Sequence, residues 1–344
     1  MPEPLVSFQS PAEFRAALWP PSIRVEPDAD LFQTLIDKGL PPLVSIRAMG
    51  VLLGVNPKLI TAMARFPKRY YRAFMVPKRS GGDRMICAPR IFLKTVQRYI
   101  LQSILETRPL PACVTGFVRG KGIVTNGRTH KAAAYVLNVD IKDFFGSVTE
   151  RAVREFFAEL GFGGHVAKTL AGLCTYQDSL PQGAPTSPCL ANLIFAPADQ
   201  QILELAERYG LTYSRYADDL TLSGNQRIAR SLLSHLEAIL RQHRFKLNQK
   251  KTRFSGPGQA RYVTGLVVNE VVHPNRRIRR SLRAMFHKAE VEPLTYSDRR
   301  AELLGWASFV NSYNTDLGGR YLTIARALAE AETATKPRKP RRHR

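Results

Sequence analysis

Two adjacent aspartates, Asp218 and Asp219, lie between two short runs of β-forming residues and constrain this chain more than any other feature. Residues 211–216 and 220–223 have the composition of strands, so they predict a hairpin with the two acids at its tip. Neighbouring carboxylates repel each other, and a fold that holds them together usually places a divalent cation beside them. The alternative is an exposed turn with both side chains in water. The rest of the chain has to decide between the two.

A third carboxylate, Asp140, ends the apolar run of residues 135–139, which has the pattern of a buried strand. Packing explains an acid in this place poorly, because burying an unpaired charge is costly. Asp143, three residues later, is better explained as a cap of the following turn or helix. We therefore predict that Asp140 joins Asp218 and Asp219 in a site for two metal ions, of the kind that transfers phosphoryl or nucleotidyl groups.

The charge balance indicates a polyanionic partner. Lys and Arg number 51 against 28 acids in 344 residues, which gives a formal net charge of +23. Leaving out the six basic residues of the proline-broken tail, 336–344, still leaves +17, so the excess belongs to the folded part. Nucleic acid is the first candidate for the partner and an acidic membrane surface the second. No apolar run approaches the roughly 18–20 residues that span a bilayer, so we expect no membrane partner.

The cysteines bear on the compartment. Four are scattered along the chain without a Cys-x-x-Cys pair, which argues against a zinc site or a disulfide framework and fits a reducing cytoplasm. Residues 1–10 lack a basic segment followed by an apolar one, so we expect no secretion signal. The sequence thus predicts a cytoplasmic protein.

A second predicted hairpin carries two basic residues. Residues 70–77 and 84–89 read as short strands joined by a glycine-containing turn, which brings Lys78 and Arg84 near one another. Bases on an exposed hairpin mostly serve solubility. The alternative is a cationic clamp on a triphosphate.

Two loops contain glycines that a ligand could approach. Gln182 and Gly183 open a stretch of small residues that runs into an apolar helix, and glycine lets a backbone come close to a ligand, although a plain helix-initiating turn is the alternative. The segment 116–122 is glycine-rich and basic, but it lacks the Gly-Lys-Ser/Thr ending of a Walker loop.

Helical spacing of apolar residues occurs in two regions, one in the N-terminal part of the chain and one in the C-terminal part. Apolar residues recur with helical period over residues 30–65, whereas residues 1–27 show no clear period and predict a loosely packed lead-in. Residues 276–289 form a predicted amphipathic helix, followed by helices from Ser297 and from about Arg320 to Glu330. The polar side of the first of these helices carries five arginines, Arg276, Arg277, Arg279, Arg280 and Arg283.

In this order, the segments resemble a reverse transcriptase from about Tyr70 to Tyr321. Tyr216-Ala-Asp218-Asp219 is similar to the family's Tyr-x-Asp-Asp box, and Asp140 stands where the family has its strand-Asp-x-x-x-Phe-Phe element. The resemblance implies an α+β right-hand polymerase with a palm whose antiparallel sheet carries the carboxylates. The implied divisions are an N-terminal helical lead-in (1–69), fingers (70–134), palm with fingers insertions (135–269), helical RNA-binding thumb (270–335) and basic disordered tail (336–344).

The resemblance also implies roles for single residues. Asp140, Asp218 and Asp219 would hold two Mg²⁺ ions, and Lys78 and Arg84 would grip the phosphates of an incoming dNTP. Phe145 would lie beneath the sugar of that nucleotide and exclude a 2′-hydroxyl, with Phe144 in the core. Gln182 would contact the nucleotide in the loop that Gly183 continues. Either Lys250 or Lys251 would assist the departure of pyrophosphate.

Within reverse transcriptases, the chain is most similar to the retron enzymes of bacteria. Asn126-x-x-x-His130 resembles their Asn-Ala-x-x-His element, with Gly127 in place of the alanine. Val263-Thr264-Gly265 matches their Val-Thr-Gly element, which helps to recognise the cognate RNA. The third feature is the small size, a fingers–palm–thumb unit with no fused RNase H, maturase or endonuclease segment.

Resemblance to the retron group implies a reaction and partners. The enzyme would copy a structured non-coding RNA into a short single-stranded DNA, starting from the 2′-hydroxyl of a guanosine and leaving a branched RNA–DNA molecule called msDNA. The arginine-rich thumb helix would hold an RNA stem through phosphate and shape contacts. A separate effector protein and a role in phage defence are also implied. The alternatives are a group II intron-like or abortive-infection reverse transcriptase, and a non-catalytic RNA-binding scaffold of the same fold.

Overall fold

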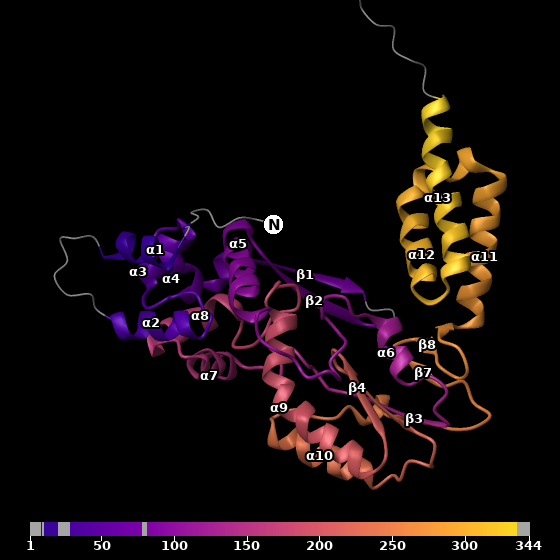
Figure 1. Cartoon of the computed structure of the whole chain (residues 1–344), viewed down its shortest axis with the longest axis horizontal. Coiled ribbons are helices and arrows are strands. Elements are labelled where there is room, and N and C mark those ends of the chain that lie inside the picture. Colours follow the sequence, from indigo (N-terminus) through magenta and orange to yellow (C-terminus); the bar gives the residue numbers. More distant parts are fainter. Residues whose placement is uncertain (1–7, 9, 20–27, 78–80, 336–344) are drawn as a thin grey trace, which may run out of the picture.

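The computed structural model describes residues 8, 10–19, 28–77 and 81–335 (Figure 1). Its centre is a four-stranded antiparallel sheet with the strand order β4-β5-β3-β6. Its strands are β3 (Tyr135–Asp140), β4 (Thr212–Tyr216), β5 (Asp219–Gly224) and β6 (Arg253–Ser255). β4 and β5 form the predicted hairpin, and β3 is the predicted buried strand. Both expectations are confirmed.

The two faces of this sheet are covered differently. Successive side chains of a strand point to opposite faces, so Leu137 and Val139 of β3 join the main apolar core while Val136 joins a smaller cluster behind the sheet. On the core side, α9 (Ser187–Arg208) packs against β4, and α10 (Leu232–Gln242) packs against α9. Behind the sheet, α6 (Ile123–Thr129) also contacts β4.

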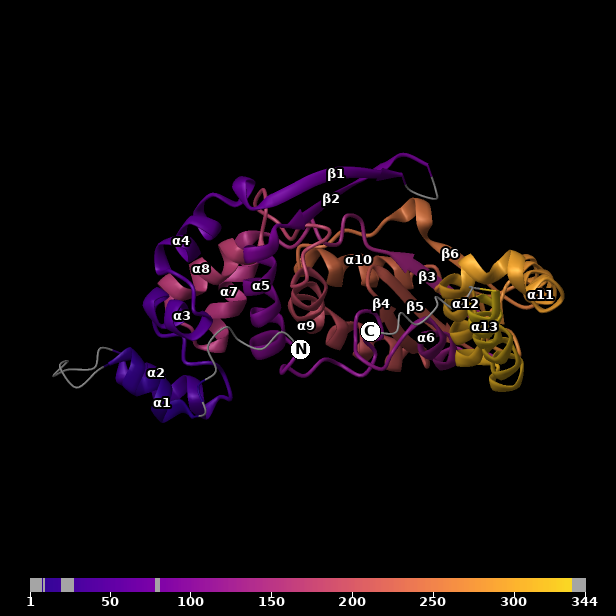
Figure 2. The ribbon, with the colours of Figure 1, turned by 90° about the horizontal axis from the view of Figure 1, so that it is seen from above.

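The second predicted hairpin is a two-stranded ribbon of β1 (Tyr71–Pro77) and β2 (Asp83–Pro89). Apart from Tyr71, every side chain of β1 is exposed, so the ribbon stands away from the body of the protein. Figure 2 shows it reaching from the α4 side of the molecule across toward β3 and β6. Lys78 lies outside the described residues.

The N-terminal part is more ordered than its composition suggests. Four helices follow one another, α1 (Pro11–Leu18), α2 (Ala29–Asp37), α3 (Ile46–Leu53) and α4 (Pro57–Arg65), and a 3₁₀ turn (Pro67–Arg69) leads into β1. The expectation of a loose lead-in over residues 1–27 is wrong for α1, because Ser10 caps this helix by accepting a hydrogen bond from the Glu13 amide and Phe14 and Leu18 are buried. A helix of two turns with two buried residues has too few apolar positions to show a period.

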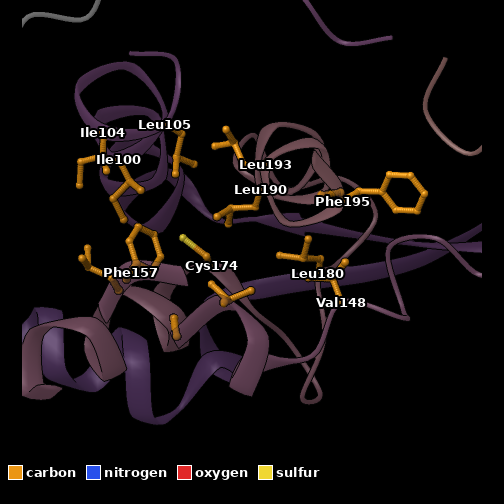
Figure 3. Packing of buried hydrophobic residues seen from close by; sticks show 14 of the residues in the cluster. Ile100, Ile104, Leu105, Val148, Phe157, Cys174, Leu180, Leu190, Leu193 and Phe195 are labelled. Carbon is orange, nitrogen blue, oxygen red and sulfur yellow. The ribbon is translucent and has the colours of Figure 1, made fainter. Parts of the chain in front are cut away.

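The main core joins these helices to the sheet. Figure 3 shows where α5 (Ile91–Ile100), the π turn that extends it (Leu101–Leu105), α7 (Glu150–Leu160), α8 (Gly164–Cys174) and α9 meet. Phe157, Cys174 and Leu190 are fully buried there. The N-terminal helices, the base of the ribbon and the palm sheet therefore share one continuous core.

A small three-stranded sheet lies behind the four-stranded sheet. Its strands are β7 (Tyr262–Val263), β8 (Leu266–Val267) and β9 (His273–Pro274), paired in that order. Between β7 and β8, Thr264 (φ 46°) and Gly265 (φ 82°) turn the chain back on itself. A 3₁₀ turn (Gln249–Lys251) precedes β6.

The C-terminal helices form a unit with its own core (Figure 1). They are α11 (Arg276–Val291), α12 (Arg300–Tyr313) and α13 (Thr315–Thr335), with a 3₁₀ segment (Pro293–Arg299) between the first two. The predicted helix start at Ser297 thus falls in the 3₁₀ segment, and the last helix begins earlier than Arg320. None of the helices that the structure describes is long and apolar enough to cross a membrane.

Candidate active site

The paired aspartates occupy a tight hairpin turn. Tyr216 of β4 pairs with Asp219 of β5, which leaves Ala217 and Asp218 as the two residues of the turn. Ala217 has φ 57°, because two-residue hairpins match the twist of their strands only with a left-handed residue at the start of the turn. The turn therefore fixes Asp218 at the tip and Asp219 at the first position of β5.

Strand pairing brings the third carboxylate to the same place. Asp140, the last residue of β3, lies directly opposite Asp219 in the antiparallel register. The next amide along the chain, Ile141 N–H, donates a 2.9 Å hydrogen bond to the carbonyl of Asp218. The end of β3 is thus tied to both aspartates of the turn, and the predicted meeting of the three acids is observed.

The three acids disfavour each other's charge. Burial, and then repulsion by Asp140, raises the pKa of Asp218. Burial, followed by repulsion from Asp218 and Asp140, raises the pKa of Asp219 to about 6, although this side chain keeps an open edge to solvent. Carboxylates grouped in this way concentrate negative charge, which a cation would neutralise. Carboxylate oxygens are also ligands that suit Mg²⁺. The donor set therefore fits divalent cations.

Asp140 is held by two other side chains. Its Oδ1 accepts a 2.8 Å hydrogen bond from Asn248 Nδ2, and its Oδ2 lies 2.7 Å from Lys251 Nζ. The hydrogen bond to Asp140 raises the pKa of Lys251. As they stand, no three His, Cys, Asp or Glu side chains of the described residues are grouped closely enough to hold a metal ion. A metal ion bound at Oδ2 of Asp140 would take the place that Lys251 Nζ occupies.

A buried ion pair supports the turn from beneath. Arg215 of β4 makes two hydrogen bonds to Asp199 of α9, Nε to Oδ1 at 2.8 Å and Nη2 to Oδ2 at 2.6 Å, and both side chains are fully buried. Arg215 Nη1 also donates to the carbonyl of Ala217 (3.1 Å) and to Asn192 Oδ1 (2.8 Å). The guanidinium carbon lies 4.6 Å from the centroid of the Phe195 ring. One arginine thus fixes the backbone that carries the aspartates.

The residues expected at the nucleotide lie around this corner. Arg84 of β2 is exposed, and its charge is near enough to lower the pKa of Asp218, which opposes the larger raising effects. Phe145 is half-buried, whereas Phe144 is in the core as expected. The carbonyl of Gln182 accepts a 2.7 Å hydrogen bond from the Cys87 amide of β2. This contact joins the Gln182 loop to the ribbon.

Gly183 permits this close approach. It has φ 120°, and a Cβ at this position would lie 3.0 Å from the Cys87 carbonyl oxygen. The neighbour that requires a glycine here is thus the β2 backbone.

The residues expected at RNA fall into exposed and buried groups. All five arginines of α11 are exposed, whereas Leu282 and Phe286 of the same helix are buried. Thr264 is partly exposed and Gly265 fully so at the tip of the β7–β8 turn. Val263 is fully buried in the small cluster behind the sheet. A direct contact of the Val263 side chain with RNA is therefore contradicted.

Comparison with known proteins shows the family to which this chain belongs. The family model described as "Reverse transcriptase (RNA-dependent DNA polymerase)" matches residues 76–279, more than half of the chain. The retron Mx65 reverse transcriptase of Myxococcus xanthus is 37% identical over 313 residues, covering 86% of this chain and 70% of the relative. The retron Ec86 reverse transcriptase of Escherichia coli is 33% identical over 301 residues, covering 84% of this chain and 91% of the relative. This chain belongs to the retron reverse transcriptases.

Family membership confirms three predictions. The retron reverse transcriptase is an RNA-directed DNA polymerase, an enzyme, and an α+β protein with the right-hand architecture of fingers, palm and thumb.

A solved structure of telomerase from Candida albicans in complex with a TWJ fragment of telomeric RNA is similar with a TM-score of 0.48 at 11% identity. That alignment covers 77% of this chain and 56% of the telomerase chain.

Asn126 and His130 of the retron reverse transcriptase are not placed to touch RNA. Both are buried between α6 and the sheet. His130 Nδ1 lies 2.7 Å from Ser223 Oγ, and Nε2 lies 2.6 Å from Ser214 Oγ. Asn126 Oδ1 accepts from Ser214 Oγ at 2.6 Å and from Thr115 Oγ1 at 2.9 Å. Their predicted RNA contact is contradicted, because both side chains are buried. The hydrogen bonds of Asn126 Oδ1 and of the His130 ring fasten α6 to β4 and β5.

The sequence did not reveal the ion pair of Arg215 and Asp199 that supports the Ala217–Asp218 turn of this polymerase. Asp199 carried a weak signal, since it follows the largely apolar stretch 189–198, whereas Arg215 lies in a strand of polar and aromatic residues. A buried charge calls for a partner. The pattern does not say which partner, because α9 and β4 meet only through the tertiary fold.

Proposed function

We propose that this retron reverse transcriptase copies a structured non-coding RNA into a short single-stranded DNA and yields the branched RNA–DNA molecule msDNA. The observation that carries the proposal is the meeting of Asp140, Asp218 and Asp219 at one end of the palm sheet. The relatives named above are retron enzymes, which supports the RNA-primed reaction over other reverse-transcriptase reactions.

The three aspartates would hold two Mg²⁺ ions. When bound, these ions activate the attacking hydroxyl and neutralise charge on the triphosphate. Lys251 would release Asp140 as the site fills and turn to the pyrophosphate. It is the better candidate than Lys250, because its Nζ already reaches the acids. Arg84, together with Lys78, would bind the triphosphate from the fingers ribbon.

The remaining nucleotide contacts are proposed for Phe145, Gln182 and Gly183. The half-buried ring of Phe145 would lie beneath the sugar of the dNTP, where it leaves no room for a 2′-hydroxyl. The Gln182 loop is hydrogen-bonded to β2, so movement of the ribbon toward a nucleotide would carry Gln182 and Gly183 with it. This coupling supports a shared nucleotide-binding role.

The RNA would lie along the thumb. The arginines of α11 would contact phosphates of an RNA stem, and the exposed Thr264–Gly265 turn would contact the same RNA from the palm side. The proposed boundaries remain 70–134 for the fingers, 135–269 for the palm and 270–335 for the thumb, with residues 1–69 and 336–344 outside. The separate core of α11–α13 supports the last division.

The biological setting is likewise a proposal. The reaction would take place in the cytoplasm, which suits the free thiols of the four cysteines. The msDNA would act with a separate effector protein in defence against phage.

Two measurements test the proposed reaction. Nucleic acid that co-purifies with the protein, expressed with its neighbouring locus, is digested and sequenced; we expect a branched species sensitive to both RNase and DNase. Recovery of RNA alone would contradict retron-type synthesis. Extension of a primed RNA template with dNTPs and Mg²⁺ is then compared with that of Asp218→Asn, and equal incorporation would contradict a catalytic role for the aspartates.

A further inference from the structure

The loop of residues 113–117 runs beside the catalytic hairpin. The amide of Arg215 donates to the Cys113 carbonyl at 2.9 Å, and the amide of Thr115 donates to the Arg215 carbonyl at 2.8 Å. Lys121 braces the same loop, since its Nζ donates to the carbonyls of Ala112 and Val114 at 3.0 Å each. The loop is therefore fastened along β4 up to the point where the turn begins.

Gly116 brings the loop against the turn itself. A Cβ at this position would lie 2.4 Å from the amide nitrogen of Ala217, a distance that atoms cannot adopt. The Gly116 carbonyl accepts a 2.9 Å hydrogen bond from Asn192 Nδ2, and Asn192 also bonds Arg215. The backbone before residue 117 thus has a fixed place beside the aspartates.

Phe117, the next residue, has an unusual backbone conformation and an exposed side chain. Its φ is 59°, a left-handed conformation that bulky residues rarely adopt, and its side chain is 52% exposed. The ring centroid lies 6.3 Å from that of Phe145 and 6.4 Å from that of Tyr216. Burial does not explain an exposed ring on strained backbone, and strained residues gather at functional sites.

We propose that Phe117 is a stacking platform for the nucleotide that carries the attacking hydroxyl. This inference rests on the proposed polymerase reaction. Phe145 is assigned to the sugar of the incoming nucleotide, and Tyr216 begins the turn that holds Asp218. The Phe117 ring neighbours both residues. It therefore adjoins the place where the primer end must meet the incoming nucleotide and the aspartates. An aromatic face accepts any base, as a polymerase requires of its primer end.

The test uses variants that separate the ring from the backbone. Phe117→Asn removes the ring but keeps a residue that tolerates the left-handed conformation, and Phe117→Tyr keeps the ring. Phe92→Ala is the matched control, because Phe92 is a 64% exposed ring at the start of α5. Single-turnover extension is measured against dNTP concentration, the primer–template dissociation constant is measured by fluorescence anisotropy, and thermal unfolding is recorded for each protein.

For Phe117→Asn we expect a loss of about 10-fold in the maximal extension rate at saturating dNTP. Its unfolding temperature should be unchanged and its KM for dNTP should change less than twofold. Phe117→Tyr and Phe92→Ala should match the wild type. An unchanged maximal rate, or a defect confined to the KM for dNTP, would overturn the proposal. Failure of the wild type to extend any primer would instead contradict the proposed function, so the two failures are distinct.

Discussion

Among single side chains, Lys251 links the resting site to the proposed reaction. It is largely exposed, yet its ammonium group is held on Asp140, a carboxylate that we propose binds metal. The ion pair thus neutralises part of the acidic cluster while no cation is bound. A metal ion that displaced Lys251 from Asp140 would free the Lys251 ammonium group. That group could then contact the phosphates of the nucleotide.

Replacement of Lys251 should separate metal binding from catalysis. In Lys251→Met, no ion pair has to be broken, so we expect Mn²⁺ to bind the protein more tightly without nucleotide, as measured by electron paramagnetic resonance of the free ion. The single-turnover extension rate should fall about 100-fold, because the charged group proposed to act on the leaving pyrophosphate would be lost. Lys250→Met serves as the control and should change neither quantity. Wild-type extension by Lys251→Met would refute its proposed role.

The Arg215–Asp199 pair gives a second prediction about single residues. Arg215→Met leaves the Asp199 charge buried without its partner, so the free energy of unfolding in urea should fall by about 3–5 kcal/mol. Adding Asp199→Asn removes that charge and keeps an acceptor for the Tyr213 hydroxyl, so much of the stability should return. Extension should stay at least about 10-fold below wild type, because the Ala217 carbonyl has lost its donor. Full activity of the double variant would contradict a positioning role.

Among the elements, α6 and the β4–β5 hairpin are joined by a polar layer. The ring of His130 reaches a serine on each strand, Ser214 on β4 and Ser223 on β5. Register is fixed in a sheet when a slip would break specific partners, and a slip of either strand would break one of these bonds. The layer therefore helps to hold Asp219 opposite Asp140.

The His130 layer makes stability depend on pH. Burial lowers the pKa of His130 to about 4, so the unfolded chain binds a proton at His130 that the folded protein does not between about pH 6.5 and 4. The contribution of neutral His130 is complete above pH 6.5 and is lost as the pH falls toward 4, by up to about 3 kcal/mol. Urea unfolding across this range should show a steeper decline for wild type than for His130→Gln. Parallel curves for the two proteins would contradict this origin of the pH dependence.

The elements also show what the sequence could predict. The acidic hairpin, the strand ending in Asp140 and the basic α11 were predictable, because each has a pattern within one short stretch of chain. The burial of Asn126 and His130 was not, because α6 is covered only when β4 and β5 pair in front of it. The same limit hid the support of Ala217 by Arg215, which depends on contact between distant segments, whereas α1 was too short to show a period.

Within the described residues, many basic side chains are exposed to solvent, among them the five arginines of α11. The arginines of α11 are spread along a helix whose other side fills the thumb core. Binding of this surface to RNA would release counterions from the phosphates, so affinity should fall as salt rises.

Salt dependence tests the thumb as the RNA site. For Arg280→Gln with Arg283→Gln, we expect the slope of log affinity against log salt to decrease by about 2, one unit for each phosphate contact. Binding of the cognate RNA stem is measured by filter retention at several KCl concentrations. Arg230→Gln, an exposed arginine ahead of α10, is the control and should leave the slope unchanged. An unchanged slope in the double variant would place the RNA elsewhere.

The division of the apolar interior sets how the molecule can flex. The core of α11–α13 is separate from the palm core, and Phe309 and Tyr313 of α12 adjoin the small cluster behind the sheet. Beside them, Arg128 of α6 donates a 2.7 Å hydrogen bond to the Ser312 carbonyl. A hinge at this narrow joint would let the C-terminal helices swing without opening either interior. Such a pivot would let the C-terminal helices follow a lengthening RNA–DNA hybrid, while the aspartate corner keeps its geometry.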